Sequence, residues 1–85
     1  MHESHIIQPV IKSILETAAK NKANRITKIT VAMSDRSGFS EEAVRTHFAL
    51  LGEGTAAAGA QVVIHKVPAQ DTIVDLYVED IEIEQ

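Results

Sequence analysis

The first three residues, Met1-His2-Glu3, carry groups that bind transition metals. The terminal amine, the amide nitrogen of His2 and the His2 ring can chelate one ion through adjoining rings. Nitrogen-rich, nearly planar donor sets suit Ni(II) or Cu(II), whereas oxygen-rich octahedral sites suit magnesium or calcium. Glu3 can supply a carboxylate oxygen beside them. The sequence therefore offers a candidate metal site at Met1, His2 and Glu3, with a solvated chain end as the alternative interpretation.

Three further histidines need a separate interpretation. His5 follows His2 by three residues, so both rings can reach a common point if a helix begins early enough. His47 precedes Phe48, and we interpret it as a histidine at the edge of the core rather than a ligand. For His65 we also favour a structural role.

Acidic residues occur in two places that suggest different roles. Asp35 either forms an exposed ion pair with Arg36 or directs its carboxylate toward the amino terminus. The alternating charges of residues 79–84 are typical of the solvent face of a strand. No nucleophile elbow, phosphate loop or zinc-protease motif is present, so we expect no enzyme activity.

Composition restricts the classes of protein to consider. The 85 residues predict one domain, residues 1–85, and the net charge of -4 with few aromatic residues argues against a nucleic-acid binder. No apolar run is long enough for a membrane span and no leader precedes the domain, so we expect a cytoplasmic protein. The absence of cysteine excludes disulfides, thiolate zinc sites and iron-sulfur clusters. Any metal must bind to nitrogen and oxygen.

Two helices are predicted from the apolar pattern. From Ser4 to about Lys22, apolar residues recur at the spacing of one helical stripe. Pro9 would remove a hydrogen bond inside this helix, so the helix should start late or bend there. Ser40, followed by two glutamates, is a good cap for a second helix that runs to about Leu51.

Three strands are predicted between and after these helices, at residues 25–33, 61–67 and 73–84. The linker 69–72 is short enough for a hairpin, so the third strand should return antiparallel to the second. Its apolar residues change parity near Glu79 and Asp80, which predicts a bulge there. The expected fold class is α+β, in the order α-β-α-β-β, with a three-stranded mixed sheet and both helices on one face.

The order of these segments, together with their residues, resembles the HypA/HybF family of nickel metallochaperones. The resemblance covers nearly the whole chain, and its motifs are modest singly but specific in their order. The matching stretches are Met1-His2-Glu3, residues 23–29, residues 35–38, the phenylalanine within residues 43–51, Gly54-Thr55 with residues 58–60, and the closing residues 76–84.

The resemblance implies a function in nickel delivery. Such proteins help to bring nickel to the large subunit of nickel-iron hydrogenase, and in some bacteria to urease, together with the GTPase HypB. It also implies that the Met1 amine, the His2 backbone and ring, and Glu3 are the nickel ligands.

This sequence departs from the family pattern in three places. Family members carry a zinc module with two Cys-x-x-Cys pairs between the last two strands, and here residues 69–72 replace it. We therefore expect no zinc. Ser34 stands where a glycine is usual, and Pro9 interrupts the first helix. The alternative to a nickel metallochaperone is a metal-free interaction module that binds a partner protein or forms a dimer or other homo-oligomer.

Overall fold

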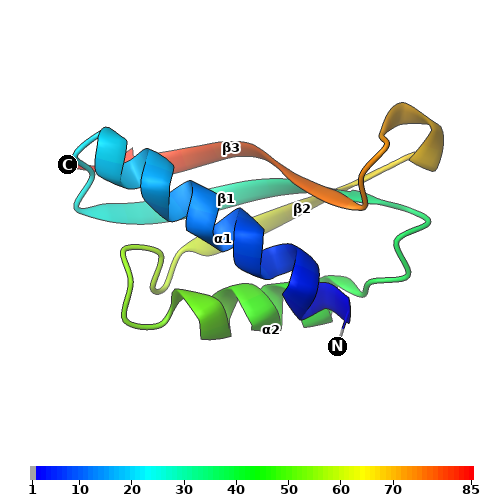
Figure 1. The fold of residues 1–85 in the computed structure, drawn as a ribbon, viewed down its shortest axis with the longest axis horizontal. Helices are drawn as coiled ribbons and strands as arrows, with labels where there is room; N and C mark the ends of the chain where they lie inside the picture. The colour runs from blue at the N-terminus through cyan, green and yellow to red at the C-terminus, as the bar shows by residue number, and fades with distance from the viewer. Residues whose placement is uncertain (1) are drawn as a thin grey trace.

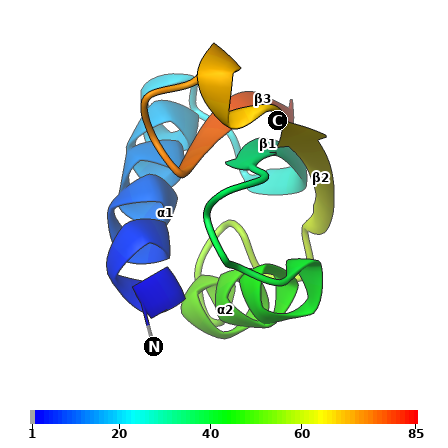
Figure 2. The same ribbon diagram turned by 90° about the vertical axis from the view of Figure 1, so that its right-hand side faces the viewer.

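A computed structural model of the chain describes residues 2–85, with the side chains of residues 5–85. The elements follow in the order α1 (His2–Lys20), β1 (Arg25–Ser34), α2 (Glu41–Gly52), β2 (Gln61–Val67), the short 3-10 helix η1 (Ala69–Asp71) and β3 (Leu76–Glu84) (Figure 1). In this part of the chain the strands form one mixed sheet, and both helices pack on the same side of it (Figure 2). The predicted α+β architecture is confirmed.

Helix α1 faces the sheet with one apolar stripe. Ile7, Ile11, Ile14 and Ala18 are all buried, at the three- and four-residue spacing of a single helical face. The helix begins at His2 and continues through Pro9, so the expected late start does not occur. Burial of the stripe favours the helical conformation on both sides of Pro9, and this outweighs one lost backbone hydrogen bond.

Helix α2 begins as predicted. The Ser40 hydroxyl accepts a hydrogen bond from the Ala43 N–H at 3.0 Å, and Glu41 and Glu42 lie in the first turn. This arrangement satisfies one of the free N–H groups of the first turn and places negative charge at the positive end of the helix dipole. Val44 and Phe48 then face the core.

Strand β1 lies at the centre of the sheet, parallel to β2 and antiparallel to β3. The predicted hairpin between the last two strands is therefore wrong, although β3 does run antiparallel to its neighbour. The central position covers both edges of the most buried strand, in which Ile29, Val31 and Met33 are each at most 1% exposed. Residues 68–75 cross the end of β1, where the Ser34 N–H donates to the Asp75 carbonyl at 2.9 Å.

The bulge predicted in β3 is confirmed. Thr30 pairs with Asp80, but the next residue of β1, Val31, pairs with Val78. Glu79 is therefore the extra residue, and it allows apolar residues of both parities to face the helices. The strand itself begins at Leu76, later than predicted, because Ile73 and Val74 belong to the exposed connection.

A second irregularity in β1 was not predicted. The register with β3 shifts between Ile26 and Lys28, which makes Thr27 the extra residue. As a result Ile26 and Ile29 are both buried, at 1% exposure each, although strict alternation assigns them to opposite faces. The shift extends the core toward the end of α1.

Candidate metal centre

Two of the predicted metal ligands, His2 and Glu3, lie at the start of α1. Met1 lies outside the described residues, and the side chains of His2 and Glu3 lie outside them as well. The backbone of His2 and Glu3 forms the beginning of α1. This end of the helix is at the opposite end of the molecule from the carboxyl terminus (Figure 1).

The backbone at a helix start has a property that matters for metal binding. The first N–H groups of an α-helix have no partner within the helix, and His2 is the first residue of α1. A metal ion can therefore take the His2 amide nitrogen without breaking a hydrogen bond of the helix. The positive end of the helix dipole disfavours a bare cation, so binding there requires negatively charged donors, such as a deprotonated amide or a carboxylate.

His5 and His47 occupy different environments. His5 is exposed and lies one turn after His2 on α1, on the same side of the helix. His47 is half-buried on α2, beside the buried Phe48. The position of His47 agrees with the predicted histidine at the edge of the core.

His65 makes a contact that the sequence did not indicate. Its Nδ1 lies 2.8 Å from Oε1 of Glu79, and the two side chains are 58% and 34% exposed. His65 belongs to β2 and Glu79 to β3, so the pair reaches across β1 on the side of the sheet away from the helices. Ala32 of β1, paired with His65 in the sheet, is fully buried. A β2–β3 hairpin register could not have revealed this contact across a third strand.

Asp35 makes contacts with the backbone that the sequence did not indicate. Its Oδ1 accepts a hydrogen bond from the Ala69 N–H at 3.1 Å, and its own N–H donates to the Val67 carbonyl at 2.9 Å. Among the ion pairs of residues 5–85, none joins Asp35 to Arg36. Asp35 therefore links the end of β1 to the start of η1 through this hydrogen bond.

The remaining described side chains do not assemble a metal site of their own. Across residues 5–85, no group of three or more histidine, aspartate or glutamate side chains is placed to hold one ion. Neither helix of the described chain combines the length and apolar character of a membrane span.

Comparison with known proteins shows which family the chain belongs to. A family model described as hydrogenase/urease nickel incorporation, metallochaperone, HypA, matches residues 1–72. The structure is similar to the solution structure of the Ni metallochaperone HypA from Helicobacter pylori, with a TM-score of 0.70 over 96% of this chain and 97% of the other. At 14% sequence identity, that likeness concerns the fold.

Curated relatives give the same family. Hydrogenase maturation factor HypA of Caldanaerobacter subterraneus subsp. tengcongensis is 37% identical over 70 residues, which cover 82% of this chain and 61% of the relative. The proteins of the same name from Synechococcus elongatus and Dehalococcoides mccartyi are 34% and 31% identical over 82% of this chain, and are covered to 62% and 59%. The chain thus spans about 60% of the length of these relatives. With the family model matching most of its residues, the chain belongs to the HypA family.

Proposed function

We propose that this chain binds Ni(II) through Met1, His2 and Glu3 and acts as a metallochaperone in the maturation of nickel-iron hydrogenase or urease. The observation that carries the proposal is the position of His2 and Glu3 at the start of α1, within the stretch that the family model matches from residue 1. In this proposal residues 1–85 are a single nickel-binding domain. Nickel is the cargo, and the protein performs no catalysis.

The donor set suits transient binding. The terminal amine, the deprotonated His2 amide and the His2 ring provide the nitrogen-rich set that Ni(II) prefers, and Glu3 provides a weaker oxygen ligand. Each nitrogen must lose or lack a proton to bind, so protons compete with the metal. A site of this kind can pass nickel to a receiver by exchanging ligands one at a time.

The proposed partners are a HypB-type GTPase and the hydrogenase large subunit. Support comes from the names of the relatives, each a hydrogenase maturation factor. The sequence has no cysteine, and residues 68–75 connect β2 to β3 directly, so we expect no zinc. We further propose a cytoplasmic location, where such an exchange between soluble proteins takes place.

Calorimetric titration with Ni(II) tests the proposal. The protein must begin at Met1 with a free amine, because a preceding tag converts the amine into an amide and removes one ligand. The parent should bind one nickel ion, with an absorption spectrum that reports planar or octahedral geometry. The His2→Ala variant should lose tight binding and keep the circular dichroism spectrum of the parent. His65→Ala, which removes a histidine on the far side of the sheet, is the matched control and should bind as the parent does.

Equal nickel affinity of the parent and the His2→Ala variant would refute the assignment of the ligands. If neither binds nickel, the metal-free interaction module becomes the better description. A pull-down that is unaffected by chelator or by His2→Ala would support that alternative.

A further inference from the structure

Strand β3 has an outer edge that pairs with no other strand of residues 2–85. The sheet order is β2-β1-β3, so β1 lies on one side of β3 only. The carbonyls of Glu82 and Glu84 accept hydrogen bonds from residues 24–27 and therefore point toward β1. Because backbone groups alternate in direction along a strand, those of Ile81 and Ile83 point to the outer side. Such a row of donors and acceptors is a template for an additional strand.

The other edge of the sheet, at β2, is less available. The Arg45 guanidinium of α2 donates a hydrogen bond to the Val62 carbonyl of β2. Glu41, also of α2, lies 3.7 Å from the Lys66 ammonium of β2. Covering side chains and lysines are devices that protect an edge strand against further pairing. Of the two edges, β3 is therefore the better site for an incoming strand.

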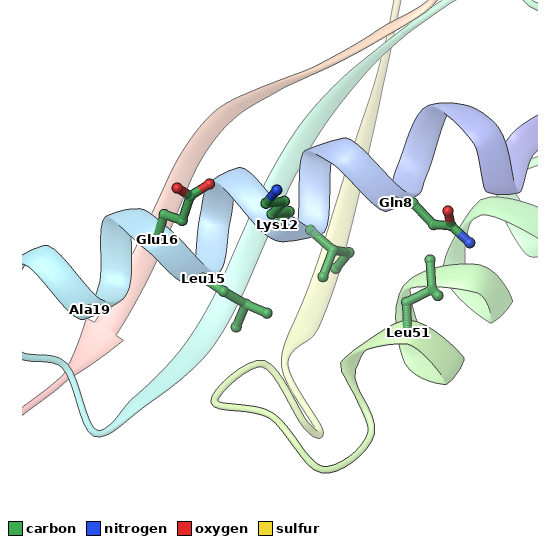
Figure 3. A pocket seen from close by; sticks show the side chains of 7 residues that line it. Gln8, Lys12, Leu15, Glu16, Ala19 and Leu51 are labelled. Atoms are coloured by element: carbon green, nitrogen blue, oxygen red, sulfur yellow. The ribbon is translucent and has the colours of Figure 1, made fainter.

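Helix α1 borders a groove on each side. Toward α2, a hollow of about 390 Å³ is lined by Leu15 and Leu51, each of which points toward the facing helix (Figure 3). Toward β3, two hollows of about 430 and 210 Å³ share Ser13 and Val78 and so adjoin each other. We call these two hollows together the α1–β3 groove. Val74, which lines the wider hollow, is 48% exposed, so apolar surface is accessible beside the open strand edge.

The face of β3 that points away from the helices is acidic. Its four carboxylates, Glu79, Asp80, Glu82 and Glu84, are all exposed, whereas the apolar residues between them are half-buried. Three of them pair with basic side chains of β1 and β2, but among the ion pairs of residues 5–85 none includes Asp80. Two β3 strands placed edge to edge would bring these carboxylates together, which disfavours a second copy of this chain as the occupant. Basic side chains on a different protein are the complement of this face.

We propose that the outer edge of β3 binds an extended segment of a different protein as a fourth strand, in which apolar side chains alternate with lysine or arginine. The apolar side chains enter the α1–β3 groove, and the basic side chains lie beside Asp80 and Glu82 on the opposite face. Backbone hydrogen bonds hold the segment, and the alternation of its side chains gives specificity. This binding is independent of nickel.

Fluorescence anisotropy with a labelled, end-capped peptide of alternating valine and lysine tests the proposal. A peptide of nine residues matches the length of β3. It should bind, whereas a peptide of the same composition with valines and lysines in separate blocks should bind about tenfold more weakly or less, because it has the charge without the alternation. A peptide with the sequence of residues 76–84 represents a second copy of this chain and should not bind. Binding of that peptide as tightly as the alternating one would overturn the choice of a basic partner.

N-methylated peptides test whether the segment binds as a strand. Methylation of every valine nitrogen removes the donors along one edge of the peptide, and methylation of every lysine nitrogen removes those along the other. Since β3 can pair with only one edge, binding should be lost with one methylated peptide and kept with the other. Equal affinity of the two methylated peptides would contradict strand addition.

Protein variants locate the binding site. Asp80→Lys should raise the Kd of the alternating peptide about tenfold, because it places a like charge beside the lysines. Glu53→Lys makes the same change of charge at an exposed position after α2 and should leave the Kd unchanged. Ser13→Trp, which fills the α1–β3 groove from α1, should abolish binding. Circular dichroism verifies that each variant is folded.

Three results would overturn the proposal. The first is a failure of the alternating peptide to bind the parent. The second is an equal Kd for Asp80→Lys and Glu53→Lys, which would show that the protein attracts the peptide by its net charge alone. The third is a folded Ser13→Trp variant that binds the peptide as the parent does, because the α1–β3 groove would then have no part in binding.

Discussion

The contact between His65 and Glu79 shows how a polar side chain acquires its role from its neighbours. The two side chains come from the two outer strands and meet over the central one. Since both are partly exposed, the contact contributes less than about 1 kcal/mol to stability. Asp35 likewise accepts a backbone hydrogen bond from Ala69. His65 and Asp35 therefore each have a contact within the protein that accounts for their position without a metal.

The nickel affinity of the proposed site should depend on pH. The ordinary pKa of histidine is about 6.5, and a protonated imidazole cannot bind a metal. Protonation therefore opposes binding, and affinity should fall steeply as the pH decreases below that value and rise above it. Calorimetric titrations of the parent at several pH values measure this dependence.

The His5→Ala variant is the control for the neighbouring imidazole. If His2 is sufficient, this variant should show the same pH dependence as the parent. A nickel affinity that does not change with pH would contradict coordination by an imidazole and point to carboxylate ligands instead.

At the scale of elements, α1 contains a local conflict. Its apolar stripe and its length favour a helix, whereas Pro9 lacks the N–H that would bond the carbonyl of His5. The Pro9 side chain is exposed, so it contributes little to the core in return. Tertiary packing of the stripe holds this turn in place.

Replacing Pro9 by alanine should therefore stabilise the protein. We expect Pro9→Ala to raise the free energy of unfolding by about 1–3 kcal/mol, because it restores a backbone hydrogen bond and removes a steric clash. Urea denaturation followed by circular dichroism measures the change. Ser13→Ala, an exposed substitution in the same helix, is the control and should change stability by no more than about 0.5 kcal/mol. An unchanged or lower stability of Pro9→Ala would show that the helix has relieved the clash elsewhere.

At the scale of the whole molecule, β1 is the element on which the others depend. It pairs with both other strands, and its buried face packs in the core formed with the two helices. The helices cover only one side of the sheet (Figure 2). Loss of packing in β1 should therefore affect every layer at once.

Two isoleucines that are paired in the sheet allow this dependence to be measured. Ile29 of β1 is 1% exposed, and its partner Ile81 of β3 is only half-buried. Ile29→Ala should lower the free energy of unfolding by about 2–5 kcal/mol, the cost of a cavity in a close-packed core. Ile81→Ala should lower the free energy of unfolding by clearly less, because the Ile81 side chain is partly solvated in the folded state. Urea denaturation compares the two, and an equal loss would contradict the central role of β1.

The sequence by itself determined the features that depend on residues close together in the chain. The apolar stripe of α1, the Ser40 cap of α2 and the parity change at Glu79 all follow from local spacing, and each prediction agrees with the structure. The metal site at Met1-His2-Glu3 could also be predicted without any distant residue, because its donors are adjacent in the sequence. Short-range sterics and hydrogen bonding decide such features.

Only the tertiary structure decided which segments lie side by side. The short linker before β3 favoured a hairpin between β2 and β3. Placing β1 between the two other strands instead removes more apolar surface from water than that hairpin would. That strand order brings His65 to Glu79. Packing likewise decided the bulge at Thr27 and the groove beside Leu15. Contacts between distant segments depend on the total surface that the whole fold buries, and no local pattern in the sequence contains that sum.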